Sequence, residues 1–343
     1  MFAPKYTITN KLLAQIKRVY ALIEELNKRR FSRVVLVELE KTARVLSSYA
    51  STSIEGNQLP LTEVKKVLKS APVHIRTSEQ EVLNYNQALT TLNQKLNTGN
   101  IVLSLDLILH THQQVMRDLL PDFESGRLRQ KPVMVNDPRT RQVVYLPPDA
   151  SDVTPLIDTL ITFLSENRQA IDPLILAGIF HKQFVLIHPF IDGNGRTTRL
   201  VTKVLLAAMG LNTFHLFSFE NYYNQNVTRY FQTVGEGGNY YELVDAIDFT
   251  LWLEYFTEGI IDELLRVQKT LPRLATSPQD ELQSHHQKLL DFVHKKGFIK
   301  DRDYATLTDR ARPTRALDFQ KLMDLGLIER KGKGKATYYV LKQ

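Results

Sequence analysis

Apolar residues recur at helical spacing through the first hundred positions. In the segment NKLLAQIKRVYALIEELNKRR, residues 10–30, they fall every three or four positions and so share one face of a helix. This stripe consists of Leu12, Leu13, Ile16, Val19, Tyr20, Leu22 and Ile23. Later runs repeat the pattern, and we therefore predict an N-terminal helical segment over residues 1–100.

The pattern changes between residues 127 and 148. Here PVMVNDPRTRQVVYLPP holds two runs of β-branched residues around an Asn-Asp-Pro turn signal, which is typical of a β-hairpin. A small hairpin in an otherwise helical region usually lies at the surface and contacts a partner.

Helical periodicity resumes at residue 153 and continues to about residue 270. Residues 271–282 contain two prolines and small polar residues, which favour a linker. Beyond it the pattern predicts a helix, a short helix, a third helix and two strands, the order of a winged helix-turn-helix. The predicted fold is mainly α, with an N-terminal segment at 1–100, a core with a small hairpin at 101–270, a linker at 271–282 and a winged helix at 283–343.

Composition narrows the chemistry that this chain can perform. Its 343 residues suffice for two or three compact units, and a hydrophobic content of 43% is ordinary for a globular protein. The chain has no cysteine, which excludes disulfides, thiolate nucleophiles and cysteine-ligated zinc. The sequence has neither an apolar run of membrane-spanning length nor the apolar core of a secretory signal, so we expect a cytoplasmic protein without a membrane partner.

The positive charge is concentrated at the C-terminus. Residues 283–343 carry 14 Lys and Arg against 7 Asp and Glu, which accounts for the whole formal net charge of +7. This excess hints at an anionic partner for the C-terminal segment alone.

Several functional side chains meet in HPFIDGNGRTTR, residues 188–199. Pro189 ends the preceding apolar helix, and the Gly-Asn-Gly turn of Gly193, Asn194 and Gly195 then leads into another helix. Backbone N–H groups at such a helix start point outward at the positive end of the helix dipole, which suits a phosphate.

The charged residues around this turn extend the interpretation to a polyphosphate. Arg196 and Arg199 lie three apart on the first turn of the helix and add two cations near the amides. Asp192 can hold Mg²⁺, which favours one carboxylate together with phosphate oxygens. His188 titrates near neutral pH and is a candidate general base for an incoming hydroxyl.

The segment HPFIDGNGRTTR resembles the Fic motif, His-x-Phe-x-Asp/Glu-Gly-Asn-Gly-Arg-x-x-Arg, at every defined position. The resemblance implies that the domain transfers AMP from ATP to a Ser, Thr or Tyr hydroxyl of a protein and releases pyrophosphate. It implies that His188 deprotonates the hydroxyl and that Asp192 holds Mg²⁺ at the α and β phosphates. Residues 193–195 would cradle the phosphates, Asn194 assisting, while Arg196 and Arg199 bind the distal ones.

The same resemblance assigns roles outside the motif. The hairpin, at residues 133–147, would be a flap that binds the protein substrate by strand addition. NQNVTRYF resembles the adenine-side helix of the family, which makes Asn226 and Tyr230 candidates for base and ribose contacts. His181 is better explained as a core histidine than as a catalytic group.

The segment STSIEGN, residues 51–57, ends a predicted helix at Gly56. Taken alone it is typical of a capped helix with a solvated Glu55. Beside a Fic motif it resembles the inhibitory motif of the family, here Ser51, Glu55 and Gly56. Glu55 paired with Arg199 would occupy the group that should hold the γ-phosphate, so that bound ATP lies misplaced for attack.

Three functions therefore compete at the level of sequence. The first is an autoinhibited, Mg²⁺-dependent protein adenylyltransferase that also modifies itself. The second is removal of AMP from a modified protein, with Glu55 positioning a water. The third is a nucleotide-sensing regulator that binds DNA through Arg312, Arg315, Lys321 and residues 331–335. The alternative for this segment is a winged helix that binds a protein or forms a homodimer.

Overall fold

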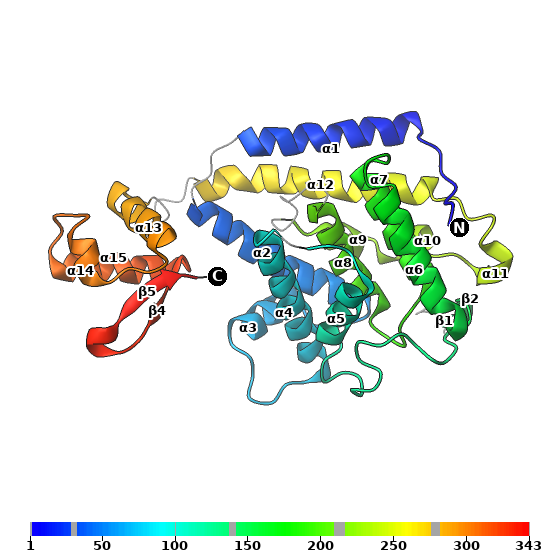
Figure 1. Ribbon diagram of the computed structural model, residues 1–343, viewed down its shortest axis with the longest axis horizontal. Helices are drawn as coiled ribbons and strands as arrows, with labels where there is room; N and C mark the ends of the chain where they lie inside the picture. The colour runs from blue at the N-terminus through cyan, green and yellow to red at the C-terminus, as the bar shows by residue number, and fades with distance from the viewer. Residues whose placement is uncertain are drawn as a thin grey trace. The chain divides into compact units, whose positions relative to one another are not determined.

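The structure is a computed structural model that describes residues 2–28, 33–99, 101–136, 142–208, 217–275 and 282–342 (Figure 1). The chain divides into two compact units. The first contains residues 1–26 and 42–266, and the second contains residues 27–41 and 267–343. The predicted domain boundaries stay predictions: α12 is helical as far as Ala275, and residues 276–281 of the expected linker lie outside the described residues.

Helices make up most of the first unit. The N-terminal helices are α1 (Asn10–Lys28), α2 (Arg33–Ile54), α3 (Leu61–Lys69), α4 (Thr77–Asn97) and α5 (Leu105–Val115). The following helices are α6 (Ala150–Glu166), α7 (Pro173–Ile187), α8 (Asn194–Ala208), α9 (Phe219–Gln225), α10 (Val227–Val234), α11 (Tyr240–Leu243) and α12 (Thr250–Ala275). The predicted mainly α fold is confirmed.

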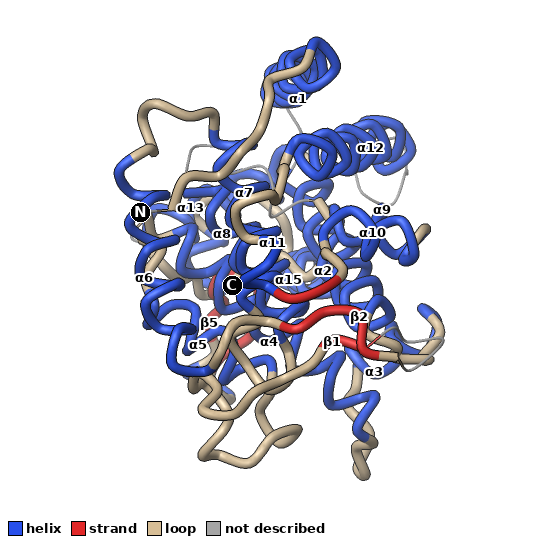
Figure 2. Tube along the Cα trace, turned by 90° about the vertical axis from the view of Figure 1, so that its right-hand side faces the viewer, coloured by secondary structure: helices blue, strands red, loops and turns tan. Residues whose placement is uncertain are grey.

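The core of this unit forms around α7, because nearly every side chain of PLILAGIFHKQFVLI is buried. Its N-cap, Asp172, accepts a hydrogen bond from the Leu174 N–H, and Pro173 occupies the first turn. Gly178 lets α12 approach closely, since a Cβ there would lie 2.5 Å from Leu253, and the Trp252 indole donates to the Gly178 carbonyl at 2.7 Å. Helix α1 runs alongside α12 (Figures 1 and 2), with Lys11 and Glu254 paired at 3.0 Å.

A small sheet lies at one end of the first unit, where Figure 1 labels β1 and β2. Strands β1 (Val135–Asn136) and β2 (Val143–Leu146) are antiparallel, and β3 (Gly238–Asn239) pairs with β2 in parallel. The predicted hairpin is therefore present in its described part, and its residues 137–141 lie outside the described residues.

The second unit contains α13 (Ser284–Lys296), α14 (Asp301–Ala305), α15 (Arg312–Asp324), β4 (Ile328–Lys331) and β5 (Tyr338–Leu341). The two strands are antiparallel, and Ile299 bridges to Tyr339. Its apolar core consists of Leu289, Leu290, Val293, Ile299, Tyr304, Phe319, Leu322, Leu327 and Ile328. The element order is the predicted one, and the winged-helix assignment itself stays a prediction. Within the described residues, no helix combines the length and apolarity needed to cross a bilayer.

Candidate active site

His188 caps the C-terminus of α7 in a left-handed conformation, with φ of 51°. For a residue other than glycine this conformation costs about 1 to 3 kcal/mol and persists only where neighbouring contacts enforce it. The ring Nδ1 lies 3.2 Å from the Val185 carbonyl, and donation to that oxygen leaves Nε2 as the unprotonated nitrogen. Burial lowers the pKa of His188 below its usual 6.5, so the ring is a neutral base at neutral pH.

The loop after His188 is held by its own side chains and by α5. Gly193 adopts φ of 77°, and a Cβ there would lie 2.5 Å from the Met116 sulfur. The Asn194 amide exchanges two hydrogen bonds with the backbone of Phe190, each 2.9 Å long. Asn194 thus closes the loop onto itself, and the phosphate contact that the resemblance implies stays a prediction.

His112 of α5 supports the same loop from behind. Its ring stacks on Phe190 with centroids 3.7 Å apart, and its Nε2 lies 2.9 Å from the Asp192 carbonyl. Its Nδ1 accepts a hydrogen bond from the Gly126 N–H at 2.9 Å, so Nε2 carries the proton. Burial lowers the pKa of His112 to about 4. The sequence analysis missed His112, because nothing in the segment THQQ, residues 111–114, distinguishes it from an ordinary helical histidine.

The carboxylate of Asp192 is 59% exposed beside the loop. Its Oδ1 accepts a hydrogen bond from Arg196 at 3.1 Å and another from the Gly193 N–H. Arg196 is itself buried and pairs also with Glu81 at 3.4 Å. A single exposed carboxylate fits Mg²⁺ only as a partial ligand, and the phosphates of a nucleotide would have to complete the coordination.

Arg199 is completely buried and faces the end of α2. Its Nε donates to Ser51 Oγ at 2.8 Å, and its Nη2 donates to the Ser51 carbonyl at 2.9 Å and to Glu55 Oε1 at 2.6 Å. Burial opposes the charge of Arg199, but Glu55, Tyr230 and Tyr85 together outweigh burial, and the pKa of the guanidinium is raised.

Glu55 also covers the glycine turn. Its Oε1 lies 2.2 Å from the position that a Cβ on Gly195 would take, so only glycine allows this approach. Gly56, with φ of 97°, ends α2 immediately after Glu55. The carboxylate is thereby held above the N-terminus of α8, where the dipole and the first amides of the helix favour an anion.

The two candidates for base and ribose contacts differ in position. Tyr230 is buried, and its hydroxyl contacts both His181 Nε2 at 3.0 Å and Arg199 Nη1 at 3.4 Å. Asn226 is exposed and caps α10 by accepting from the Arg229 N–H at 3.0 Å. The structure therefore brings Tyr230 to the arginine and leaves Asn226 outside this cluster. His181, with its second ring nitrogen 3.1 Å from Thr202, is the predicted core histidine.

Strand β2 of the hairpin has three exposed apolar side chains and one buried tyrosine. Val143, Val144 and Leu146 are 49%, 40% and 39% exposed. Tyr145 is buried, and its hydroxyl donates to the Leu186 carbonyl at 3.0 Å. Because β3 already pairs with Tyr145 and Leu146, an added strand would meet the hairpin at residues 143–144 or along β1.

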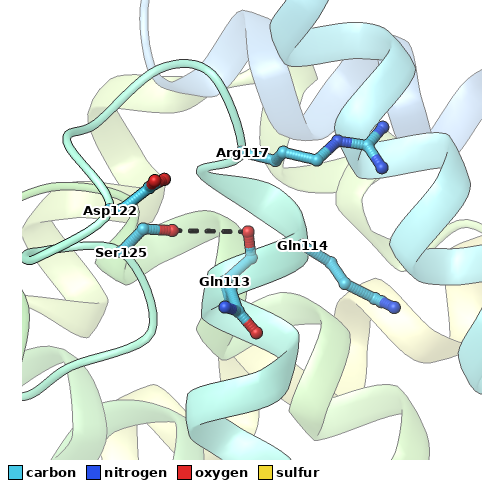
Figure 3. Close-up of a pocket in the computed structure, with 5 residues that line it drawn as sticks. All are labelled: Gln113, Gln114, Arg117, Asp122 and Ser125. Atoms are coloured by element: carbon cyan, nitrogen blue, oxygen red, sulfur yellow. Dashed lines mark hydrogen bonds between the residues drawn. The ribbon is translucent and has the colours of Figure 1, made fainter.

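A hollow of about 450 Å³ lies on another face of α5 (Figure 3). Its lining consists of Gln113, Gln114, Arg117, Asp122 and Ser125. The Ser125 hydroxyl donates to the Gln113 carbonyl at 3.5 Å across it. None of these residues belongs to the motif.

Residues 102–206 match the model of the Fic/DOC family. Among curated proteins, the chain is 28% identical over 220 residues to "Protein adenylyltransferase Fic" of Aedes aegypti, which covers 59% of this chain and 42% of that protein. It is 31% identical over 200 residues to "Protein adenylyltransferase fic-1" of Caenorhabditis elegans, covering 57% and 38%. The chain thus matches less than half the length of these relatives.

Solved structures agree with the fold. A crystal structure of a Fic family protein from Desulfovibrio desulfuricans superposes with a TM-score of 0.66 at 22% identity, covering 99% of this chain and 98% of that one. Fic-1 from C. elegans superposes with a TM-score of 0.60 at 23% identity, covering 76% and 73%. At these identities the likeness supports the fold alone.

Proposed function

We propose that this chain, which carries a Fic domain, is an autoinhibited protein adenylyltransferase. Its substrates would be ATP and a protein with a Ser, Thr or Tyr hydroxyl, and the products would be the AMP-modified protein and pyrophosphate. The support comes from the cluster around His188 and Arg199 and from the named activity of the curated relatives.

The positions of His188, Arg199 and the start of α8 support the following chemical step. The acceptor oxygen attacks the α-phosphorus, its proton passes to Nε2 of His188, and the bond from the α-phosphorus to the bridging oxygen breaks. Pyrophosphate leaves with that electron pair. The amides at the start of α8 and the guanidinium of Arg199 would stabilise the charge on the phosphates.

Mg²⁺ fits the exposed carboxylate of Asp192 and would be held there together with phosphate oxygens. When bound, it would neutralise part of the negative charge that the phosphates carry. Arg196 orients the carboxylate by its contact with Oδ1.

One observation carries the proposal of autoinhibition. The Glu55 carboxylate lies 2.6 Å from Arg199 Nη2 and directly over Gly195, in the space that the anion-binding turn offers to a phosphate. A nucleotide bound in this state could not bring its terminal phosphate to Arg199.

Labelled ATP tests the proposed reaction directly. The full chain and a Glu55→Gly variant are incubated with lysate, once with an α-phosphate label and once with a γ-phosphate label. The α label should become protein-bound, including on the chain itself, and the γ label should not. Transfer of the γ label would instead establish a kinase.

AMP removal is the second candidate reaction at this site. The position of Glu55 favours it, because the side chain is 29% exposed and close enough to the phosphate cradle to orient a water. Release of label from pre-modified protein by the unaltered chain, lost in Glu55→Gln, would support this direction. Initial rates of incorporation and release must be measured separately.

The hairpin is the proposed docking place of the protein substrate, because its outward valines offer an apolar strand surface. Whether the chain acts as a monomer or a homodimer, and whether it works in the cytoplasm, stay predictions from the sequence. The substitution Val143→Asp would test the docking. Modification of lysate proteins should fall, while the affinity for ATP should remain unchanged.

A different class of function, DNA binding, is proposed for the second unit. The side chain of Arg312 is 87% exposed and Leu317 is 68% exposed on α15, as expected for a surface that contacts a partner. Asp301 pairs with both arginines of this helix, with Arg315 at 2.9 Å and with Arg312 at 3.9 Å. Duplex binding by the full chain should fall steeply with salt if phosphates are contacted, whereas salt-independent binding would favour a protein partner.

A further inference from the structure

The carbonyl groups at the end of α7 all have partners, from Phe184 to Pro189. The first two accept from the backbone N–H and the ring of His188, and the third accepts from Tyr145. The remaining three carbonyls, of Ile187, His188 and Pro189, are all held by Arg129. Its Nε donates to the His188 carbonyl at 2.8 Å, its Nη2 reaches the Ile187 carbonyl at 3.4 Å, and its backbone N–H donates to Pro189 at 2.9 Å.

The same guanidinium reaches both ends of the hairpin. Its Nη1 donates to the Lys131 carbonyl at 3.1 Å, and its Nη2 donates to the Pro148 carbonyl. These two residues bracket the segment 133–147. Arg129 is only 2% exposed, so these contacts are shielded from water.

Only an arginine suits this arrangement. Its planar fork carries five N–H donors that can reach carbonyls in several directions, whereas a lysine offers three donors on one atom. Among the described residues, every hydrogen bond from this guanidinium ends on a backbone carbonyl. The cation also lies at the C-terminus of α7, where the helix dipole favours positive charge.

We propose that Arg129 is a positioning residue that ties the backbone of His188 to both ends of the hairpin. The left-handed conformation of His188 needs such enforcement, and the two bonds at Ile187 and His188 supply it. A strand docked on the hairpin would then present its hydroxyl at a fixed distance from Nε2. Transfer reactions depend strongly on such placement, because small misalignments cost large factors in rate. This inference rests on the proposed function.

The alternative is an arginine that only stabilises the fold. It would change thermal stability and leave the ring of His188 and the rate per folded molecule unaffected. The test therefore needs a readout of the ring itself and a separation of kcat from KM.

The experiment compares Arg129→Lys and Arg129→Met with a matched control, Arg127→Met, all in the Glu55→Gly background. Arg127 is exposed two positions earlier. We expect kcat for self-labelling from α-labelled ATP to fall about 10- to 100-fold in Arg129→Met, with KM for ATP changed less than about twofold. Arg129→Lys should recover part of the rate, millimolar guanidinium should raise the rate of Arg129→Met, and Arg127→Met should match its parent.

Two further measurements do not depend on activity. Nitrogen NMR of the ring, assigned with His188→Gln, should show His188 mainly with the proton on Nδ1 in the parent and a mixture of tautomers in Arg129→Met. Hydrogen exchange at residues 142–146 should be faster in Arg129→Met. If the parent transfers no label, the proposed function fails while these two readouts still decide on Arg129.

An unchanged kcat, ring tautomer and exchange rate in folded Arg129→Met would overturn the proposal. If Arg129→Met does not fold, Arg129→Lys decides by the same readouts, because it keeps the charge and loses the fork. Full kcat and an unchanged ring in Arg129→Lys would overturn the proposal equally.

Discussion

Two helix ends border the motif loop, and each binds a charge opposite to its own dipole. The C-terminus of α7 is held by the cation of Arg129, and the N-terminus of α8 is covered by the anion of Glu55. Arg129 is buried, and its side-chain hydrogen bonds end on backbone carbonyls, which hold the cation in place at this end. Glu55 is 29% exposed and contacts the turn through its side chain alone, so under the proposed function a phosphate would replace it. Under the proposed function, the same electrostatics gives a fixed end that carries the base His188 and an exchangeable end, at Glu55, that would receive the nucleotide.

Removing the base at the fixed end should have the largest effect on the rate of AMP transfer. In the Glu55→Gly background, His188→Ala should lower the rate of AMP transfer about 10²- to 10⁴-fold, because no base then takes the proton of the attacking hydroxyl. ATP affinity, measured by calorimetry, should stay within about twofold. His110→Ala, an exposed histidine of α5, is the control and should have no effect. Retained activity in His188→Ala would remove this residue from the mechanism.

The exchangeable end is tested by removing its anion. Glu55→Gly should raise the initial rate of α-label incorporation about 10- to 100-fold, equivalent to about 1 to 3 kcal/mol, because Arg199 becomes available to a phosphate. Glu55→Gln should give a smaller gain, since it keeps the shape of the side chain without its charge. Glu63→Gln, at a glutamate on α3 whose side chain is 42% exposed, should give none.

The gain should depend on Arg199. In an Arg199→Ala background, Glu55→Gly should add little, because the pair is already broken and the phosphate clamp is lost. An equal gain in both backgrounds would mean that Glu55 inhibits by another route.

The metal site should respond more moderately. Asp192→Asn keeps the shape and removes the charge that Mg²⁺ needs, so the Mg²⁺ concentration for half-maximal transfer should rise about 10-fold or more. Asp122→Asn, in the hollow of Figure 3, is the control and should leave it unchanged. A normal Mg²⁺ dependence in Asp192→Asn would place the metal elsewhere.

The local sequence predicted the turn at the start of α8 better than the contacts of Arg129 at the end of α7. A Gly-Asn-Gly sequence before a helical pattern predicts a turn that enters a helix, and the structure has this turn at the start of α8. That the turn binds an anion stays a prediction. The contact between Glu55 and Arg199 spans 144 positions, and only the family resemblance joins the two residues. Arg129 lies 59 positions before His188, with no local signal that its partners are carbonyls.

Two side chains that the family resemblance assigns to the nucleotide make other contacts in the structure, and their nucleotide contacts stay predictions. Asn194 bonds the Phe190 backbone, because an amide at the start of α8 can both donate and accept within the loop. Asn226 caps α10, a role that the order Asn-Val-Thr-Arg before an apolar residue could have suggested. Motif matching conveys residue identity, whereas hydrogen-bond partners depend on the folded backbone.

The two ends also act on the ring of His188 in opposite senses, which predicts the smallest effect. Burial is the main cause of its lowered pKa, Glu55 raises that pKa, and Arg129 lowers it. Because the base works when neutral, a lowered pKa moves the loss of activity to more acid solution. Between pH 7.5 and 6.5 the rate should therefore fall by less than the factor of about two expected for an unshifted histidine. NMR titration of the ring should show a further decrease of the pKa in Glu55→Gly, where an anion is lost, and an increase in Arg129→Met, where a cation is lost. Shifts in the same direction in both variants would mean that changes in burial, rather than the two charges, control the base.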